Sequence, residues 1–186
     1  MLGSASLCVL LGIAAPPLEL RLVMIDFVRI APQVSGGMLE EARRLLGPKG
    51  VGLLTRQGTA AEQRLPGEVG VLLLSERSRG KSRGGQRLGA IQTTAGVTTI
   101  WIDVPAVASV AEANRGLHCC SAEMRRLGLA LGRVLTHELV HLLDPALAHT
   151  RNGLMAARVD RATLVDDPAP DTPLRIVKRP NSDWDN

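Results

Sequence analysis

The chain has 186 residues, a net charge of +4 and a hydrophobic fraction of 45%. This length suits one globular domain with its own core, and the hydrophobic fraction excludes wholesale disorder. Only 2% of the residues are aromatic, so the core must be aliphatic. Because few aromatic side chains are available to stack on bases, no nucleic-acid partner is expected despite the positive charge.

The first fifteen residues form an apolar run. It is too short for a membrane span and resembles the apolar region of a secretory signal peptide, with the small residues Gly12, Ala14 and Ala15 at a suitable cleavage point. No Lys or Arg precedes the run, which keeps a buried first strand or helix as the alternative. We expect residues 1–15 to be a signal peptide and the protein to be exported to the periplasm or the exterior, with a cytoplasmic location as the alternative.

A β-α-β unit is predicted to follow. Residues 18–30 are rich in Leu, Val and Ile and predict a strand, and residues 38–46 carry an apolar stripe at helical spacing that ends before Gly47. Residues 51–55 predict a second strand. This order favours parallel pairing of the two strands.

Two further strands are predicted at residues 69–74 and 97–104, the latter β-branched and bounded by Gly96 and Pro105. A stretch rich in Ser and Gly separates them. We expect it to be a solvated loop, with a patch that binds an acidic partner as the alternative. Its basic residues are Arg77, Arg79, Lys81, Arg83 and Arg87.

The rest of the chain divides into a long helix and an irregular end. Residues 121–143 are apolar at helical spacing and predict one helix. Residues 161–186 are acidic and proline-rich, so an irregular tail is expected there, and residues 16–160 form the predicted domain. The predicted fold class is therefore α/β (α+β), with a mixed, mostly parallel sheet, a long helix and an irregular lower segment.

The long helix carries the residues that indicate chemistry. His137 and His141 are four residues apart, so both imidazoles project from one helix face, as two corners of a tetrahedral zinc site require. Glu138 follows the first histidine, where it can act as general base on a zinc-activated water. A His pair on the solvated face of the helix is the alternative, but a His-Glu-His cluster in an otherwise apolar helix would be costly to bury without a role.

A catalytic zinc needs a third protein ligand. No Glu follows Glu138, which leaves Asp144, His149 and Asp160. Pro145 biases Asp144 away from helical geometry, whereas His149 lies beyond this break, where the chain can turn back towards the metal. His149 is the predicted third ligand, and Asp144 stays open as the alternative.

His137, Glu138 and His141, then His149, then Gly153-Leu154-Met155, together resemble a metzincin metallopeptidase with its Met-turn. The metzincin pattern has Gly three residues after the second His and the third His three residues later, whereas His149 comes two residues late. The spacing is similar to that of small, exported bacterial metzincin-like proteins.

The resemblance implies specific roles for these residues. His137, His141 and His149 correspond to zinc ligands, Glu138 to the base, and Met155, following Gly153, to the residue beneath the metal. It also implies that the strand containing Trp101 is the sheet edge that binds an extended peptide.

The sequence therefore predicts a Zn²⁺-dependent metallopeptidase that acts on a peptide or protein. Two alternatives remain: a non-catalytic zinc-binding module, and a protein that binds a partner through its basic loop. The chain has no Tyr to assist the developing oxyanion, so Arg151 or Arg158 are the candidates for a second electrophile.

Overall fold

Five strands form one sheet in the computed structural model, which describes residues 18–75, 87–113 and 121–166. The strand order is β2-β1-β3-β5-β4, with β4 antiparallel to β5 and all other neighbours parallel. This confirms the predicted α/β class with a mixed, mostly parallel sheet. In chain order the elements are β1 (Leu18–Asp26), α1 (Pro32–Leu46), the 3-10 helix η1 (Gly47–Lys49), β2 (Val51–Gln57), β3 (Glu68–Leu74), β4 (Gly89–Thr94), β5 (Val97–Asp103), α2 (Val104–Val110), α3 (Ser121–Leu143) and α4 (Arg161–Val165).

The first strand is shorter than predicted. It ends at Asp26, because the Asp26 carboxylate accepts hydrogen bonds from the backbone N–H groups of Val28, Arg29 and Ile30 at 2.8–2.9 Å. Such side-chain acceptors favour a turn over continued strand. The apolar residues after Asp26 therefore belong to the connection to α1.

Helix α1 begins at Pro32, not at residue 38 as predicted. Proline is well suited to a first helical turn. Gly36 and Gly37 lie inside the helix, and α1 crosses α3 so closely that two glycines of α3 have no room for a side chain. A Cβ on Gly128 would lie 3.0 Å from the Val34 carbonyl oxygen, and one on Gly132 would lie 2.6 Å from that of Met38.

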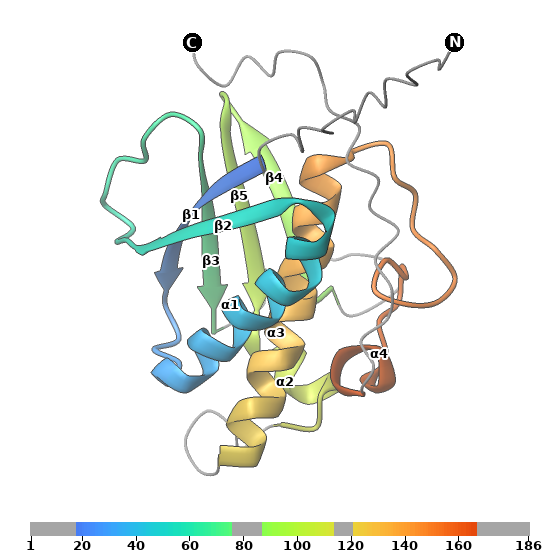
Figure 1. Ribbon diagram of the computed structural model, residues 1–186. Coiled ribbons are helices and arrows are strands. Elements are labelled where there is room, and N and C mark those ends of the chain that lie inside the picture. The colour runs from blue at the N-terminus through green and yellow to red at the C-terminus, as the bar shows by residue number, and fades with distance from the viewer. Residues whose placement is uncertain (1–17, 76–86, 114–120, 167–186) are drawn as a thin grey trace, which may run out of the picture.

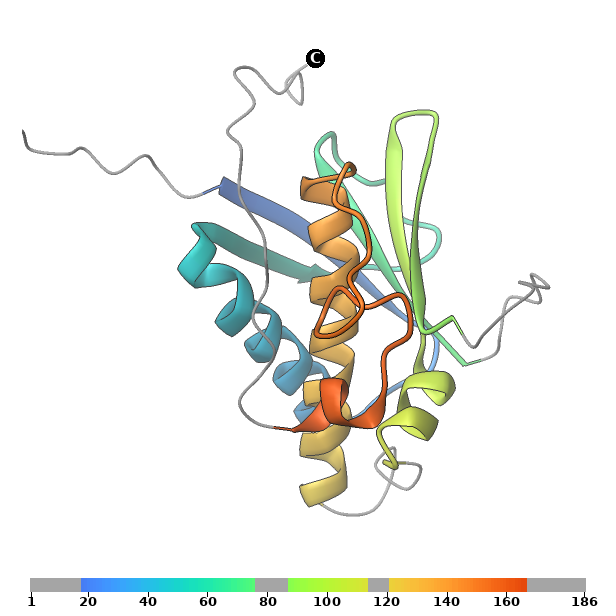
Figure 2. The same cartoon turned by 90° about the vertical axis from the view of Figure 1, so that its right-hand side faces the viewer.

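Helices α1 and α3 lie against the same face of the sheet (Figures 1 and 2). A buried ion pair joins them, since Arg133 Nε on α3 donates to Glu41 Oε1 on α1 at 2.9 Å. Arg44 also donates to the Glu41 carboxylate. Burial raises the pKa of Glu41, but the hydrogen bonds from Arg44 and Arg133 outweigh burial and lower it overall.

Strand β4 was not predicted, and it changes which strand is at the edge of the sheet. It joins β5 through a two-residue turn in which Ala95 and Gly96 have φ angles of 51° and 76°. Hairpins of this kind usually carry Asn-Gly or Asp-Gly, so the residues Ala95 and Gly96 do not indicate a hairpin turn. The expectation that Trp101 lies on the edge strand is wrong, because β4 covers β5 on that side.

The remaining differences lie near α2 and α4. The strand predicted to residue 104 ends at Asp103, whose carboxylate accepts the Ala106 N–H at 2.8 Å and so caps α2. The stretch from 161, for which an irregular course was predicted, begins with α4, and Leu164 is buried in the core. Residues 1–15, most of the basic stretch and residues 167–186 lie outside the described residues, so export remains a prediction. Among the described helices, none has the length and hydropathy to cross a membrane.

Candidate metal centre

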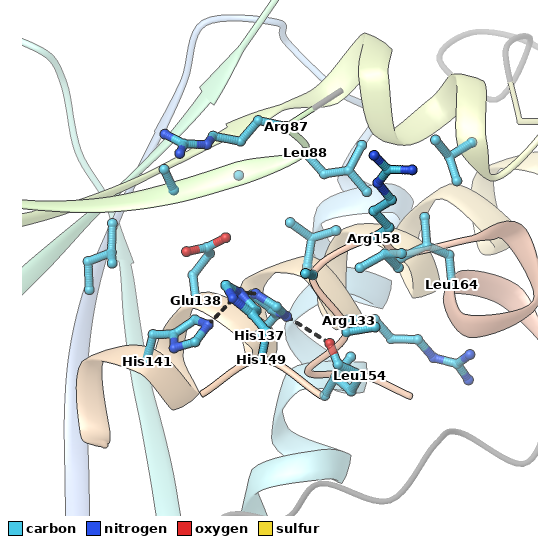
Figure 3. A pocket seen from close by; sticks show the side chains of 18 of the residues that line it. Arg87, Leu88, Arg133, His137, Glu138, His141, His149, Leu154, Arg158 and Leu164 are labelled. Atoms are coloured by element: carbon cyan, nitrogen blue, oxygen red, sulfur yellow. Dashed lines mark hydrogen bonds between the residues drawn. The ribbon is translucent and has the colours of Figure 1, made fainter. Parts of the chain in front are cut away.

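Three histidine side chains meet beside α3. His137 and His141 project from the last turns of the helix, and His149 approaches them from the segment that follows (Figure 3). The Nε2 atoms of His141 and His149 are 3.1 Å apart, and those of His149 and His137 are 3.3 Å apart. Within the described parts of the chain, no other group of three or more His, Cys, Asp or Glu side chains converges in this way.

The backbone after α3 brings His149 to this position. Thr150 N–H donates to the Met155 carbonyl at 2.8 Å, and Thr150 forms an isolated β-bridge with Ala156. Gly153 has a φ of 82°, a conformation that glycine adopts without strain. These contacts close the loop between Thr150 and Ala156 against α3, with Met155 buried in the core.

One backbone contact sets the tautomer of His137. Its Nδ1 lies 2.7 Å from the Leu154 carbonyl oxygen, which can only accept, so Nδ1 carries the proton. The lone pair of His137 is therefore on Nε2, the atom that faces the other two histidines. The sequence could not predict this contact, because it depends on a main-chain oxygen and not on a side chain.

The electrostatics keep two of these imidazoles neutral. Burial lowers the pKa of His137, with a smaller opposing effect from the Leu154 hydrogen bond. Burial and the neighbouring His137 and His149 lower the pKa of His141 to about 4. Both rings are thus in the form that can donate a lone pair at neutral pH.

Glu138 faces a cavity of about 950 Å³ beside the histidines. Burial raises its pKa to about 7, and the positive charge of Arg87 opposes that rise. Among the described residues the carboxylate accepts no hydrogen bond. The backbone of Gly89, at the start of β4, passes close by, and a Cβ there would lie 3.1 Å from Glu138 Oε1.

The cavity contains residues that the sequence did not single out. Arg87 was assigned to a solvated loop and Gly89 to no element, yet both line the cavity opposite α3. Only a prediction of the β4 strand that begins at Gly89 could have placed these two residues beside α3. Arg158, one of the two candidate electrophiles, also lines the cavity, whereas Arg151 does not.

The donor set fits a zinc ion. Tetrahedral zinc with Zn–N bonds of about 2.0–2.1 Å holds its nitrogens about 3.3 Å apart, close to the two Nε2–Nε2 distances given above. Three imidazole nitrogens without a carboxylate are ligands that zinc accepts and that calcium and magnesium do not prefer. Asp144, the alternative third ligand, does not belong to the cluster.

Comparison with known proteins does not assign the chain to a family. No family model and no curated protein matches it. Among solved structures, the archaemetzincin from Methanopyrus kandleri is similar to it with a TM-score of 0.49 and 15% sequence identity, over 82% of this chain and 88% of that chain. A TM-score below 0.5 at this identity establishes no relationship, so only the residues of the site itself support a function.

Proposed function

We propose that this protein is a metzincin-like zinc metallopeptidase. His137, His141 and His149 would hold the ion, and Glu138 would be the general base. One observation carries the proposal: three ring nitrogens converge, with two Nε2–Nε2 distances at the spacing of zinc ligands, and the Leu154 carbonyl leaves the His137 lone pair on the converging atom.

The residues around the ion have separate tasks in this proposal. When bound, zinc supplies Lewis acidity, which polarises a peptide carbonyl and makes a nearby water more acidic. Glu138 would take a proton from the water and deliver it to the leaving amine. Its carboxylate is suited to this task because it faces the cavity. It accepts no hydrogen bond from any described residue, so its oxygens are available to accept a proton.

The surroundings of the site support a peptide as substrate. Strand β4 is one of the two edge strands of the sheet and borders the cavity through Gly89, Ala90 and Ile91. An edge strand can hold an extended peptide by backbone hydrogen bonds. Met155, which follows Gly153, would support the histidines from the core.

Zinc content and peptide cleavage of the wild type and of Glu138→Gln test the proposal. We expect one zinc per chain in both proteins, with cleavage lowered about 10²- to 10⁴-fold in the variant, since this is the usual contribution of a general base. Equal zinc binding with cleavage by neither protein would identify a non-catalytic zinc module instead.

The third ligand is tested by His149→Ala beside Asp144→Ala. Loss of a residue that hydrogen-bonds to a metal ligand commonly costs about 10- to 100-fold in metal affinity, so loss of a ligand itself should cost more than about 100-fold. We expect His149→Ala to lose zinc and Asp144→Ala to keep it, as measured by competition with a chelator. Loss in the Asp144 variant alone would overturn the assignment.

A further inference from the structure

The cavity beside the histidines has walls of unequal chemistry. Its apolar part is formed by Leu88, Val134, Leu154, Val159 and Leu164, among others. The charged residues that line it are three arginines and one acidic residue, Glu138. Within the described part of the chain, positive charge therefore dominates the lining.

The three arginines differ in what surrounds them. Arg133 is fully buried, with Nε on Glu41 and Nη1 on the carbonyl oxygens of Thr163 and Asp166 at 2.9 and 2.8 Å. Its charge is compensated by Glu41, and its position is fixed between α1, α3 and α4. Arg133 is therefore held in the wall by these partners, and only its buried Nη2 has no hydrogen-bond partner among the described residues.

Arg87 and Arg158 are exposed and lie across the cavity from Glu138. Figure 3 shows them on either side of Leu88, above the histidine cluster. Arg87 has no hydrogen bond or ion pair with any described residue, yet it is close enough for its charge to act on Glu138. A guanidinium of this kind offers several N–H donors to a carboxylate, and it would repel an ammonium group.

We propose that Arg87, with Arg158 on the other side of Leu88, makes this cavity select peptides that carry Asp or Glu beside the bond to be cleaved. This proposal rests on the peptidase function proposed above. The apolar part of the cavity can bind the methylene groups of an acidic side chain, while the adjacent arginines bind its carboxylate. A Lys side chain would meet like charge at the same place.

Binding can be measured without turnover in the full-length, zinc-loaded Glu138→Gln protein. The probes are three fluorescein-labelled peptides of alanine and leucine with one central Glu, Gln or Lys. Fluorescence anisotropy at low salt gives the three dissociation constants. We expect the Glu peptide to bind about three- to tenfold more tightly than the Gln peptide, as for a charge-assisted contact at a partly exposed site, and the Lys peptide to bind more weakly than both.

Charge reversal at Arg87 separates a local contact from the overall positive charge of the chain. Arg87→Glu should reverse the order so that the Lys peptide binds more tightly than the Glu peptide. Arg125→Glu is the matched control, because Arg125 is exposed on α3 and does not line the cavity. This control should leave the order unchanged.

Several results would overturn the proposal. These are equal binding of the three peptides, no measurable binding of any of them, an Arg125→Glu effect as large as that of Arg87→Glu, or displacement of the Glu peptide by an equal concentration of a single-stranded oligonucleotide. Wild-type cleavage of the three peptides at equal rates would also overturn it while leaving the peptidase intact. Selective binding without any cleavage by the wild type would overturn the peptidase and keep the charge selection.

Discussion

Replacing Gly89 by alanine changes the site through a single atom. The added Cβ would lie 3.1 Å from Glu138 Oε1, 3.1 Å from Val134 Cγ1 and 3.2 Å from the Trp101 carbonyl oxygen. These separations are a few tenths of an ångström shorter than ordinary contacts of a Cβ atom. The Trp101 carbonyl is held in the sheet, so the side chains of Glu138 and Val134 must move.

The magnitudes predict a small effect on stability and a larger one on activity. Replacing glycine by alanine stabilises a chain by about 0.4–1 kcal/mol through the unfolded state, whereas overpacking costs about 1–3 kcal/mol. The net loss should be about 1 kcal/mol, or about 2–4 °C in Tm. A catalytic group misplaced by about 1 Å can cost 100-fold in rate, so a shift of the Glu138 carboxylate by part of that distance should cost about tenfold in kcat.

The assay combines kcat for peptide cleavage, zinc content and thermal unfolding. Gly52→Ala is the control, because a Cβ at this position in β2 would meet Glu19 Cγ at 3.8 Å, an ordinary contact. We expect Gly52→Ala to keep the wild-type kcat. Gly89→Ala with full zinc content and an unchanged kcat would refute the reasoning, as would an equal loss of kcat in both variants.

Three further predictions concern the stability of the fold. Gly36→Ala adds a Cβ with no neighbour within 4 Å inside α1, so it should raise the free energy of unfolding by about 0.5–1 kcal/mol in urea titration; destabilisation would show that the helix start is misplaced. Glu41→Gln leaves the buried Arg133 charge without its counter-ion and should cost about 3 kcal/mol at pH 7. The pKa of Glu41 in the folded state lies below its ordinary value of 4.5, so this contribution to stability is fully present above pH 4.5 and is lost as the pH falls through the folded-state pKa. The free energies of unfolding of the variant and the wild type should therefore converge in acid. A difference that stays constant with pH would contradict this. Removing zinc with a chelator should lower Tm, since an ion at 1,000 times its Kd stabilises the folded state by about 4 kcal/mol, and His149→Ala should show no such change; an equal chelator effect on both proteins would contradict the site.

The sequence predicted the parts of the site that depend on local spacing. His137 and His141 lie on one helix face because the helical period requires it, and α3 has the predicted bounds, 121–143. The turn after Pro145 brings His149 back to the other two histidines, as expected. The β-α-β unit also follows from local patterns, since its strands pair in parallel.

Contacts between segments that are far apart in the chain could not be predicted from the sequence. The start predicted at residue 38 reflects the low helix propensity of Gly36 and Gly37, yet both lie inside α1. The close packing of the two helices requires small residues on α3, at Gly128 and Gly132. The short β4 strand has polar residues and a turn without Asn or Asp, so neither periodicity nor turn chemistry indicated it. As a result, Arg87 and Gly89 could not be associated with Glu138.

The Leu154 carbonyl has a consequence for how such a site changes over time. Any residue at position 154 supplies the same oxygen to His137, so point substitutions there cannot remove the acceptor, although the buried Leu154 side chain restricts which residues fit. An insertion or deletion between His149 and Leu154 would move the oxygen away, and the proton of His137 would no longer be held on Nδ1. Homologous proteins that keep this site should therefore tolerate substitutions in this loop far better than changes in its length. A comparison based on residue identity would miss the retained loop length.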